Sequence, residues 1–323
     1  MFDELPDQWL PAAFSSKLGA KVPIAVTVDG APLALFRDRE GRPQALIDAC
    51  PHRSVKLSLG TVENGCLRCP FHGWEFGAGG ACERVPLNPE ARRELLGAAA
   101  LPTVERGGIV WIFTRIGAEA PALPELPDSL EDKALARREL EDPWAAHWTR
   151  AMENMLDVPH LPFVHRGTIG REMAARRDLY DVPLTFDLQD APYGFRLGWA
   201  MGGKPEAGHL EWRRPVGMVL YIASPVGEMR QHIFCVPSTP GHTNMMLVST
   251  AQRPWWTALI PGFVFNGFED RILGEDRAIV QSSAPGSVIH AGHEKSIATD
   301  KPTLRFRAWL KSQRRGPPPE SAS

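Results

Sequence analysis

The chain has 323 residues, of which 43% are hydrophobic and 23% charged, and this globular balance excludes collagen-like and wholly disordered proteins. Its formal net charge of −2 provides no basic field for nucleic acid and no attraction to an acidic membrane surface. The most apolar stretch, residues 255–268, is interrupted by Pro261 and Gly262, so no membrane span is predicted. Five cysteines are too few for a disulfide scaffold, so we expect reduced thiols and a cytoplasmic location.

In chain order, residues 20–115 predict short β-strands, because runs such as VPIAVTV and GGIVWIFT are separated by turn residues. Residues 116–142 are rich in proline, alanine and glutamate, which predicts a surface linker. A helical pattern begins near Trp144. Residues 180–252 return to strands spaced as in an antiparallel meander, and a second helix is predicted over about 263–282. The predicted fold class is α+β, with a small all-β domain first.

Cysteine and histidine concentrate in one short region between turn residues. The pairs are Cys50-x-His52 and Cys69-x-x-His72, and such a set of two thiolates and two imidazoles can hold either a zinc ion or a [2Fe–2S] cluster. Zinc sites usually begin with two cysteines two to four residues apart, and a Cys-x-His start is cramped around a single ion. A two-iron cluster fits better, because each pair can give its cysteine to one iron and its histidine to the other.

The whole loop pair, CPHRS…LSLG…CPFHGW, resembles the Rieske signature. The match continues beyond the ligands to Trp74, and Lys56 departs from the proline or small residue expected there. This resemblance implies an N-terminal all-β Rieske domain over residues 1–120 with a [2Fe–2S] cluster. The implied cluster ligands are Cys50, His52, Cys69 and His72. The remaining cysteines, Cys66, Cys82 and Cys235, are then ordinary thiols, although Cys66 forms a CxxC with Cys69.

A second candidate metal motif is ENMLDVPHLPFVH, residues 153–165. Asp157 and His160 are three residues apart and would share a helical face. His160 and His165 are five apart, so they converge only if the chain bends at Pro159 and Pro162. Two histidines and one carboxylate form the facial triad of non-haem Fe(II) oxygenases, which leaves positions open for O2.

The second predicted helix, residues 263–282, offers the carboxylate of that triad. Asp276 interrupts a stripe of apolar residues at helical spacing, and a buried carboxylate must be paired or bound to metal. Glu269 also falls near the stripe and remains a rival, although an acidic residue in the first turn also favours the helix N-terminus. Glu275 at the stripe's edge and Asp270 off it are expected to be solvated. The stripe consists of Phe265, Phe268, Ile272, Ile279 and Val280.

The two motifs, in this order and about eighty residues apart, are similar to the α subunit of Rieske non-haem iron oxygenases, from about Trp9 to Leu310. The branch most resembled is that of the homotrimeric monooxygenases and O-demethylases, of the vanillate or dicamba demethylase type. The resemblance implies a catalytic domain at 121–310, an antiparallel sheet flanked by helices (helix-grip, START-like), and a disordered tail at 311–323. The implied Fe(II) ligands are His160, His165 and Asp276.

Two further residues near the iron receive roles from the same resemblance. Asp157 would be a bridge and not a ligand, hydrogen-bonding His160 and, by position, His72 of a neighbouring subunit, as a carboxylate that orients the imidazole and offers an electron path. Asn154, one turn earlier, would lie near the iron, and a helix-capping or packing role is an equal alternative.

The function implied is that of a terminal oxygenase which hydroxylates or oxidatively dealkylates a mainly apolar small molecule with O2. Electrons would come from NAD(P)H through a separate reductase, with or without a ferredoxin, because this chain carries no nucleotide-binding glycine fingerprint. Phe265, Phe268, Met152 and Met155 hint at an apolar pocket. A ring cis-dihydroxylating dioxygenase is one alternative. A Rieske electron-transfer or binding protein without catalytic iron is an alternative of another class.

Overall fold

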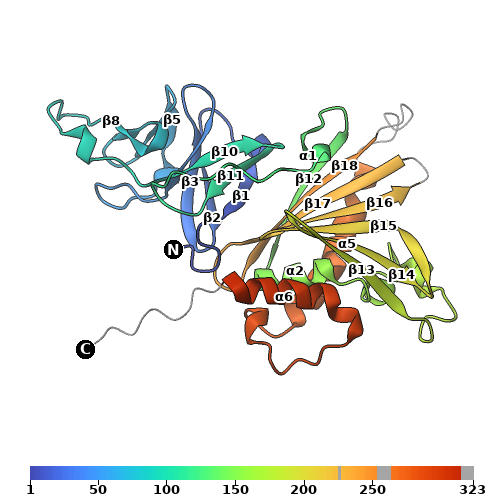
Figure 1. The fold of residues 1–323 in the computed structure, drawn as a ribbon. Helices are drawn as coiled ribbons and strands as arrows, with labels where there is room; N and C mark the ends of the chain where they lie inside the picture. Colours follow the sequence, from blue (N-terminus) through green and yellow to red (C-terminus); the bar gives the residue numbers. More distant parts are fainter. Residues whose placement is uncertain (225–226, 253–262, 314–323) are drawn as a thin grey trace, which may run out of the picture. The chain divides into compact units, whose positions relative to one another are not determined.

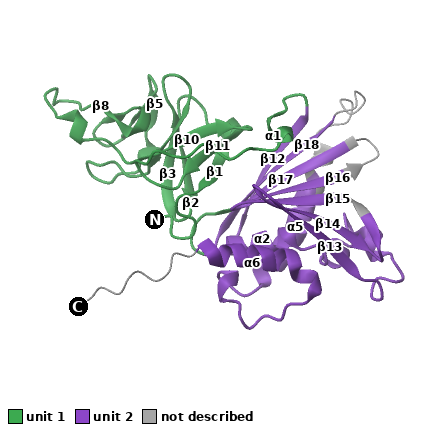
Figure 2. Cartoon of the chain, in the orientation of Figure 1, with its two compact units in different colours: residues 1–134, 236–240 green, residues 135–235, 241–323 purple. Residues whose placement is uncertain are grey.

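The computed structural model describes residues 1–224, 227–252 and 263–313 (Figure 1). The chain forms two compact units, the first comprising Met1–Ala134 with Val236–Pro240 and the second Leu135–Cys235 with Gly241–Ser323 (Figure 2). The first unit therefore extends past residue 120, where the sequence predicts the domain boundary, and includes a short segment from much later in the chain.

The first unit is built from three small antiparallel sheets and one short helix. Its elements are β1 (Trp9–Phe14), β2 (Ile24–Val28), β3 (Ala31–Arg37), β4 (Pro43–Ile47), β5 (Thr61–Glu63), β6 (Cys66–Arg68), β7 (Glu75–Phe76), β8 (Cys82–Arg84), β9 (Ala100–Leu101), β10 (Thr103–Arg106), β11 (Ile109–Phe113) and α1 (Asp128–Glu131). The sheet orders are β1-β11-β10, β2-β3-β4-β9 and β5-β6-β7-β8. The predicted all-β N-terminal domain is confirmed, and β1 begins before the predicted strand region.

Local sequence explains these short strands. The β2–β3 hairpin turns at Asp29 and Gly30, both with positive φ, as a two-residue hairpin loop requires. The sheet β5-β6-β7-β8 packs its inward side chains, including Leu67 and Phe76, into one cluster with Cys50 and Cys69. The two predicted cluster loops are therefore anchored by packing against a buried apolar cluster.

The second unit contains one seven-stranded sheet with helices beside it (Figure 1). Its strands are β12 (Ala136–Trp144), β13 (Leu184–Ala191), β14 (Gly194–Met201), β15 (Lys204–Arg213), β16 (Gly217–Ser224), β17 (Gly227–Pro237) and β18 (Thr243–Ala251). The order is β12-β18-β17-β16-β15-β14-β13, which confirms the predicted meander. The predicted linker at 116–142 is wrong in its last part, because these residues form β12, an edge strand whose charged side chains hid its pattern.

The helices of the second unit are α2 (Trp148–Leu156), α3 (Leu161–Val164), α4 (Arg171–Ala174), α5 (Phe263–Ser282) and α6 (Lys301–Gln313). Helix α5 contacts α2, α3 and β12, and Phe306 of α6 packs edge-on against Trp148 of α2 and Trp212 of β15. Because α6 ends at Gln313, the first residues of the predicted tail are helical, and residues 314–323 lie outside the described residues. No helix in the described ranges is both long and apolar enough to cross a membrane.

Candidate metal centres

The two cysteine–histidine loops of the first unit have the same backbone design. In the first loop the Cys50 N–H donates to the Val55 carbonyl (2.8 Å) and the Ser54 N–H donates back to Cys50 (2.8 Å). In the second, Cys69 bonds Trp74 (2.8 Å) in the same way, and Gly73 bonds back to Cys69 (3.1 Å). The fifth residue of each loop, Ser54 or Gly73, has a positive φ. Two equivalent loops thus present one cysteine and one histidine each.

The side chains of these loops meet, with both cysteines buried and the rings of His52 and His72 4.6 Å apart between centroids. The Nδ1 atom of His52 is buried and has no hydrogen-bond partner among the described residues, and its ring stacks on Trp74 at 4.6 Å. Burial raises the pKa of the Cys50 thiol to about 11, with a further contribution from Cys69. An orphaned imidazole nitrogen and two buried thiols, one of them with a raised pKa, fit a site that a metal group completes.

The donor atoms of this quartet do not close around one ion. Among the described residues, the one set of three or more His, Cys, Asp or Glu side chains whose ligand atoms lie within 4.8 Å of one another is found elsewhere, in the second unit. A single zinc ion needs its four ligands about 2.0–2.3 Å away, which would bring them closer together than this limit. The quartet therefore fits the wider [2Fe–2S] cluster better than zinc.

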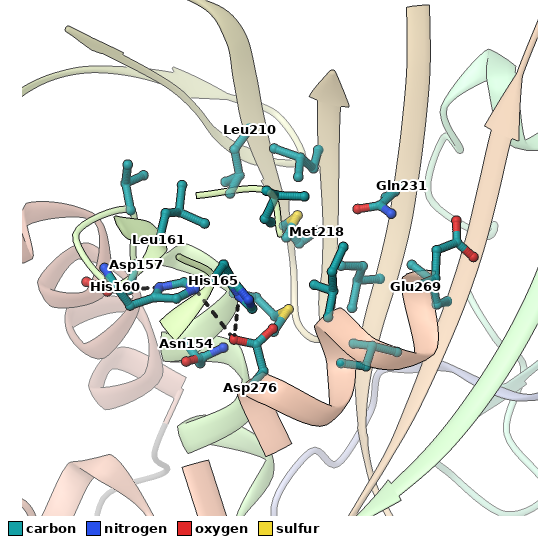
Figure 3. A pocket seen from close by; sticks show the side chains of 18 of the residues that line it. Asn154, Asp157, His160, Leu161, His165, Leu210, Met218, Gln231, Glu269 and Asp276 are labelled. Carbon is teal, nitrogen blue, oxygen red and sulfur yellow. Dashed lines mark hydrogen bonds and ion pairs between the residues drawn. The ribbon is translucent and has the colours of Figure 1, made fainter. Parts of the chain in front are cut away.

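The set that does converge consists of His160, His165 and Asp276 (Figure 3). The Nε2 atoms of His160 and His165 lie 3.5 Å and 3.0 Å from Asp276 Oδ1, yet this buried oxygen has no hydrogen bond of good geometry to any residue that the structure describes. Three ligands bound to one metal at about 2.1 Å and at right angles are about 3 Å apart, so these atoms point at a shared centre more than at one another.

The sequence predicts a chain bend that brings the histidines together. In the structure this bend follows the end of a helix and is not a distortion within one. Helix α2 ends at Leu156, and Asp157 is already extended, so Asp157 and His160 do not share a helical face. Instead, Asp157 Oδ2 accepts hydrogen bonds from the backbone N–H of His160 (3.0 Å) and faces its Nδ1 (3.1 Å). His160 and His165 flank the short α3, with ring centroids 5.1 Å apart.

One glycine helps to hold this bend. The Gly170 N–H donates to the His165 carbonyl (3.0 Å), and a Cβ at Gly170 would lie 1.8 Å from the Leu161 carbonyl oxygen. No side chain fits there, so the close return of the chain over α3 depends on glycine.

Helix α5 provides the carboxylates Asp276 and Glu275, and the environment of Glu275 differs from the predicted one. Asp276 is buried, as its place in the apolar stripe predicts. The expectation that Glu275 is solvated is wrong, because its Oε2 lies 2.9 Å from Nδ1 of His165. Burial lowers the pKa of His165, but Asp276 and Glu275 outweigh that effect and leave it raised. Glu269 is held by Arg138 and does not join the convergent set.

A pocket of about 660 Å³, part of it open to solvent, adjoins this centre. Its walls come from the sheet, from α5 and from the α2–α3 segment, and they are mostly apolar (Figure 3). Asn154 lines it beside the histidines, with its side-chain Nδ2 buried and without a partner in the described part of the chain. Met155 lines it as predicted, Met152 is not among its walls, and the side chains of Phe265 and Phe268 lie outside the described residues. The other walls include Leu161, Trp199, Leu210, Met218, Leu220, Ile233, Leu247 and Ile272.

Of the polar residues at the far end of the pocket, Gln231 was not predicted, and Glu269 was considered only as a rival iron ligand. Gln231 and Glu269 lie at the opposite end of the pocket from His160 and His165 (Figure 3). The Gln231 amide has no hydrogen-bond partner within residues 1–224, 227–252 and 263–313, so it is available to a ligand. Strand alternation could have placed Gln231 on the same face as Ile233, but only the fold shows that this face lines the pocket.

Family models match both units. Residues 8–104 match the Rieske [2Fe-2S] domain, and residues 144–315 match the vanillate O-demethylase oxygenase C-terminal domain. The second match covers the convergent histidines, Asp276 and the pocket.

Individual relatives are similar to most of this chain. The chlorophyllide a oxygenase of Chlamydomonas reinhardtii is 29% identical over 93% of this chain and 47% of its own length. The methylxanthine N1-demethylase NdmA of Pseudomonas putida is 27% identical over 83% of this chain and 76% of its own. This chain spans about half the length of the chlorophyllide oxygenases that it matches. Dicamba monooxygenase with bound dicamba shares the fold, with a TM-score of 0.75, 22% identity and coverage of 95% and 96% of the two chains.

Proposed function

Because the chain belongs to the Rieske non-haem iron oxygenases, with a catalytic domain of the vanillate O-demethylase type, we propose that it is a terminal oxygenase that oxidatively demethylates a mainly apolar small molecule. The observation that supports this most is the convergence of His160, His165 and Asp276 at the end of an apolar pocket, in a chain that also holds the cysteine–histidine loops. The ring dihydroxylation and electron-carrier alternatives are less favoured, since the catalytic domain matches the vanillate O-demethylase model and the similar proteins include the methylxanthine and dicamba demethylases.

Each metal group has its own residues. Cys50, His52, Cys69 and His72 would hold the [2Fe–2S] cluster, and the triad would hold Fe(II). When bound, the two groups supply stored electrons and O2 activation. The overall reaction is then RO–CH3 + O2 + 2e− + 2H+ → RO–CH2OH + H2O, and the hemiacetal releases formaldehyde and the alcohol.

The protein itself orients the metal ligands and excludes bulk water from the pocket. Asp157 orients the His160 imidazole, and the apolar walls keep bulk water from the reacting methyl group. Electrons would come from NAD(P)H through a separate reductase, with or without a ferredoxin. Asp157 would bond His72 of a neighbouring copy in a homotrimer. None of the five cysteines, all of which the structure describes, forms a disulfide, and this fits the proposed cytoplasmic location.

The substrate class follows from the polarity of the pocket. Its described walls contain no lysine or arginine, and its far end offers the Gln231 amide and the Glu269 carboxylate, which Arg138 already neutralises in part. An aryl methyl ether or N-methyl heterocycle with an uncharged hydrogen-bonding group opposite its methyl group suits this arrangement. A free carboxylate at that end would face Glu269 without a cation in the walls to offset the repulsion.

Turnover tests this function directly. We expect the iron-loaded chain, with a reductase and NADH, to convert 4-methoxyphenol to hydroquinone with one formaldehyde per O2 consumed, and to act on 4-methoxybenzoate much more slowly. Gln231→Leu should raise the KM for 4-methoxyphenol by about tenfold, the effect of losing one hydrogen bond of about 1.4 kcal/mol, with little change in kcat.

Anisole, which lacks the distal hydroxyl, is the matched control, and Gln231→Leu should leave its KM unchanged. Equal effects on both ethers would contradict the role of Gln231. A product with both oxygen atoms of O2 on the ring would favour the dioxygenase alternative. No substrate-dependent O2 uptake with any ether, N-methyl compound or tetrapyrrole, despite full iron loading, would favour the electron carrier.

A further inference from the structure

Both oxygens of the Glu275 carboxylate have polar partners. Oε2 lies 2.9 Å from Nδ1 of His165 and accepts a hydrogen bond of 2.8 Å from the Thr168 hydroxyl. Oε1 accepts a hydrogen bond of 3.1 Å from Nε of Arg271, one helical turn earlier. Three groups from two segments of the chain therefore fix the direction in which this carboxylate meets the imidazole (its side chain is 22% exposed, and that of His165 only 1%).

This contact determines which nitrogen of His165 remains for metal. A carboxylate at Nδ1 holds the proton on that atom, so the lone pair lies on Nε2, which faces Asp276 Oδ1 at 3.0 Å. His160 has the same arrangement, with Asp157 Oδ2 3.1 Å from its Nδ1 and its Nε2 turned toward Asp276. The two histidines thus have matching carboxylate partners from different parts of the chain.

We propose that Glu275 is the positioning residue for His165. The two adjacent residues of α5 then have different roles, because Asp276 is an iron ligand and Glu275 fixes the orientation of the His165 imidazole. This inference rests on the proposed iron site. Surface pairing with Arg271 alone does not explain the contact, because the Arg271 side chain is 62% exposed and exposed i,i+4 pairs contribute little. The oxygen that faces inward is the one shared by His165 and Thr168.

The test measures Fe(II) binding to the full chain after its mononuclear iron has been removed and its cluster retained. Glu275→Ala should weaken Fe(II) binding by about 10- to 100-fold, the usual effect of losing a partner of a metal-bound histidine. Glu275→Gln, which can still accept the Nδ1 hydrogen bond, should weaken it less. The EPR spectrum of the Fe(II) site with nitric oxide as probe should change shape in the alanine variant and largely recover in the glutamine variant.

Asp270→Asn is the matched control, because Asp270 lies on the same helix and its side chain is 52% exposed. It should leave Fe(II) affinity and the EPR spectrum unchanged. The visible spectrum of the cluster and the thermal unfolding midpoint report folding in every variant. If the alanine variant does not fold, Glu275→Leu takes its place, because leucine fills similar space and accepts no hydrogen bond. Wild-type affinity and an unchanged spectrum in a folded Glu275→Ala or Glu275→Leu variant would overturn the inference alone. Failure of the wild-type chain to bind Fe(II) would overturn the proposed function and the inference with it.

Discussion

Replacing Asp276 by alanine is expected to abolish demethylation and to remove the mononuclear iron, while the cluster in the first unit keeps its visible spectrum. Only His160 and His165 would remain as ligands, and two neutral imidazoles neither balance the charge of Fe(II) nor complete a facial triad. Iron analysis should fall from about three atoms per chain to about two, with acid-labile sulfide unchanged at about two. The same loss of turnover is expected for His160→Ala.

Glu269→Gln is the control for this assignment, because Glu269 is the rival carboxylate on the same helix. Its carboxylate is held by Arg138 at the far end of the pocket, so the variant should keep its iron and lose at most substrate affinity. The reverse pattern, with iron lost in Glu269→Gln and retained in Asp276→Ala, would show that the third ligand has been misassigned.

Replacing Asp157 by asparagine is expected to slow electron delivery to the iron by about a hundredfold, although both metal sites remain loaded. An amide can still accept a hydrogen bond from His160, but it lacks the charge that stabilises both His160 and His72 of the partner subunit in the proposed trimer. The measurement is stopped-flow oxidation of the reduced cluster in a single turnover with substrate and O2.

The control for Asp157→Asn is Asp178→Asn, a carboxylate-to-amide change at an exposed position that pairs with Arg176. The reduced cluster of this control variant should be oxidised at the wild-type rate. A wild-type rate in Asp157→Asn as well would exclude the bridging role and leave Asp157 as a cap of the bend at His160.

Much of the fold could be predicted because its signals are local. Alternating runs predicted the meander, and α5 was predicted at its observed bounds of 263–282 from one apolar stripe. Strand β12 was missed because its sequence, ARRELEDPW, carries charges on both faces, which an edge strand tolerates and a linker resembles. Its pairing partner, β18, lies about a hundred residues further along the chain, beyond the reach of any local pattern.

In the candidate site, too, some residues could be predicted from the sequence and others could not. Asp276 could be predicted because a carboxylate in an apolar stripe needs a partner. Glu275 could not, because periodicity places it at the stripe's edge, and its partner His165 is 110 residues away in the sequence. The contact of Gln231 with the pocket likewise depends on which sheet face α5 covers, and that is decided by tertiary packing.

The central claim is that one chain holds both a [2Fe–2S] cluster and a separate mononuclear iron. Iron, zinc and acid-labile sulfide per chain, measured on anaerobically purified protein together with its visible spectrum, test this most directly. We expect about three irons to two sulfides and a Rieske-type spectrum. Two irons to two sulfides that added Fe(II) cannot raise would contradict the mononuclear site, and zinc without sulfide would contradict the cluster itself.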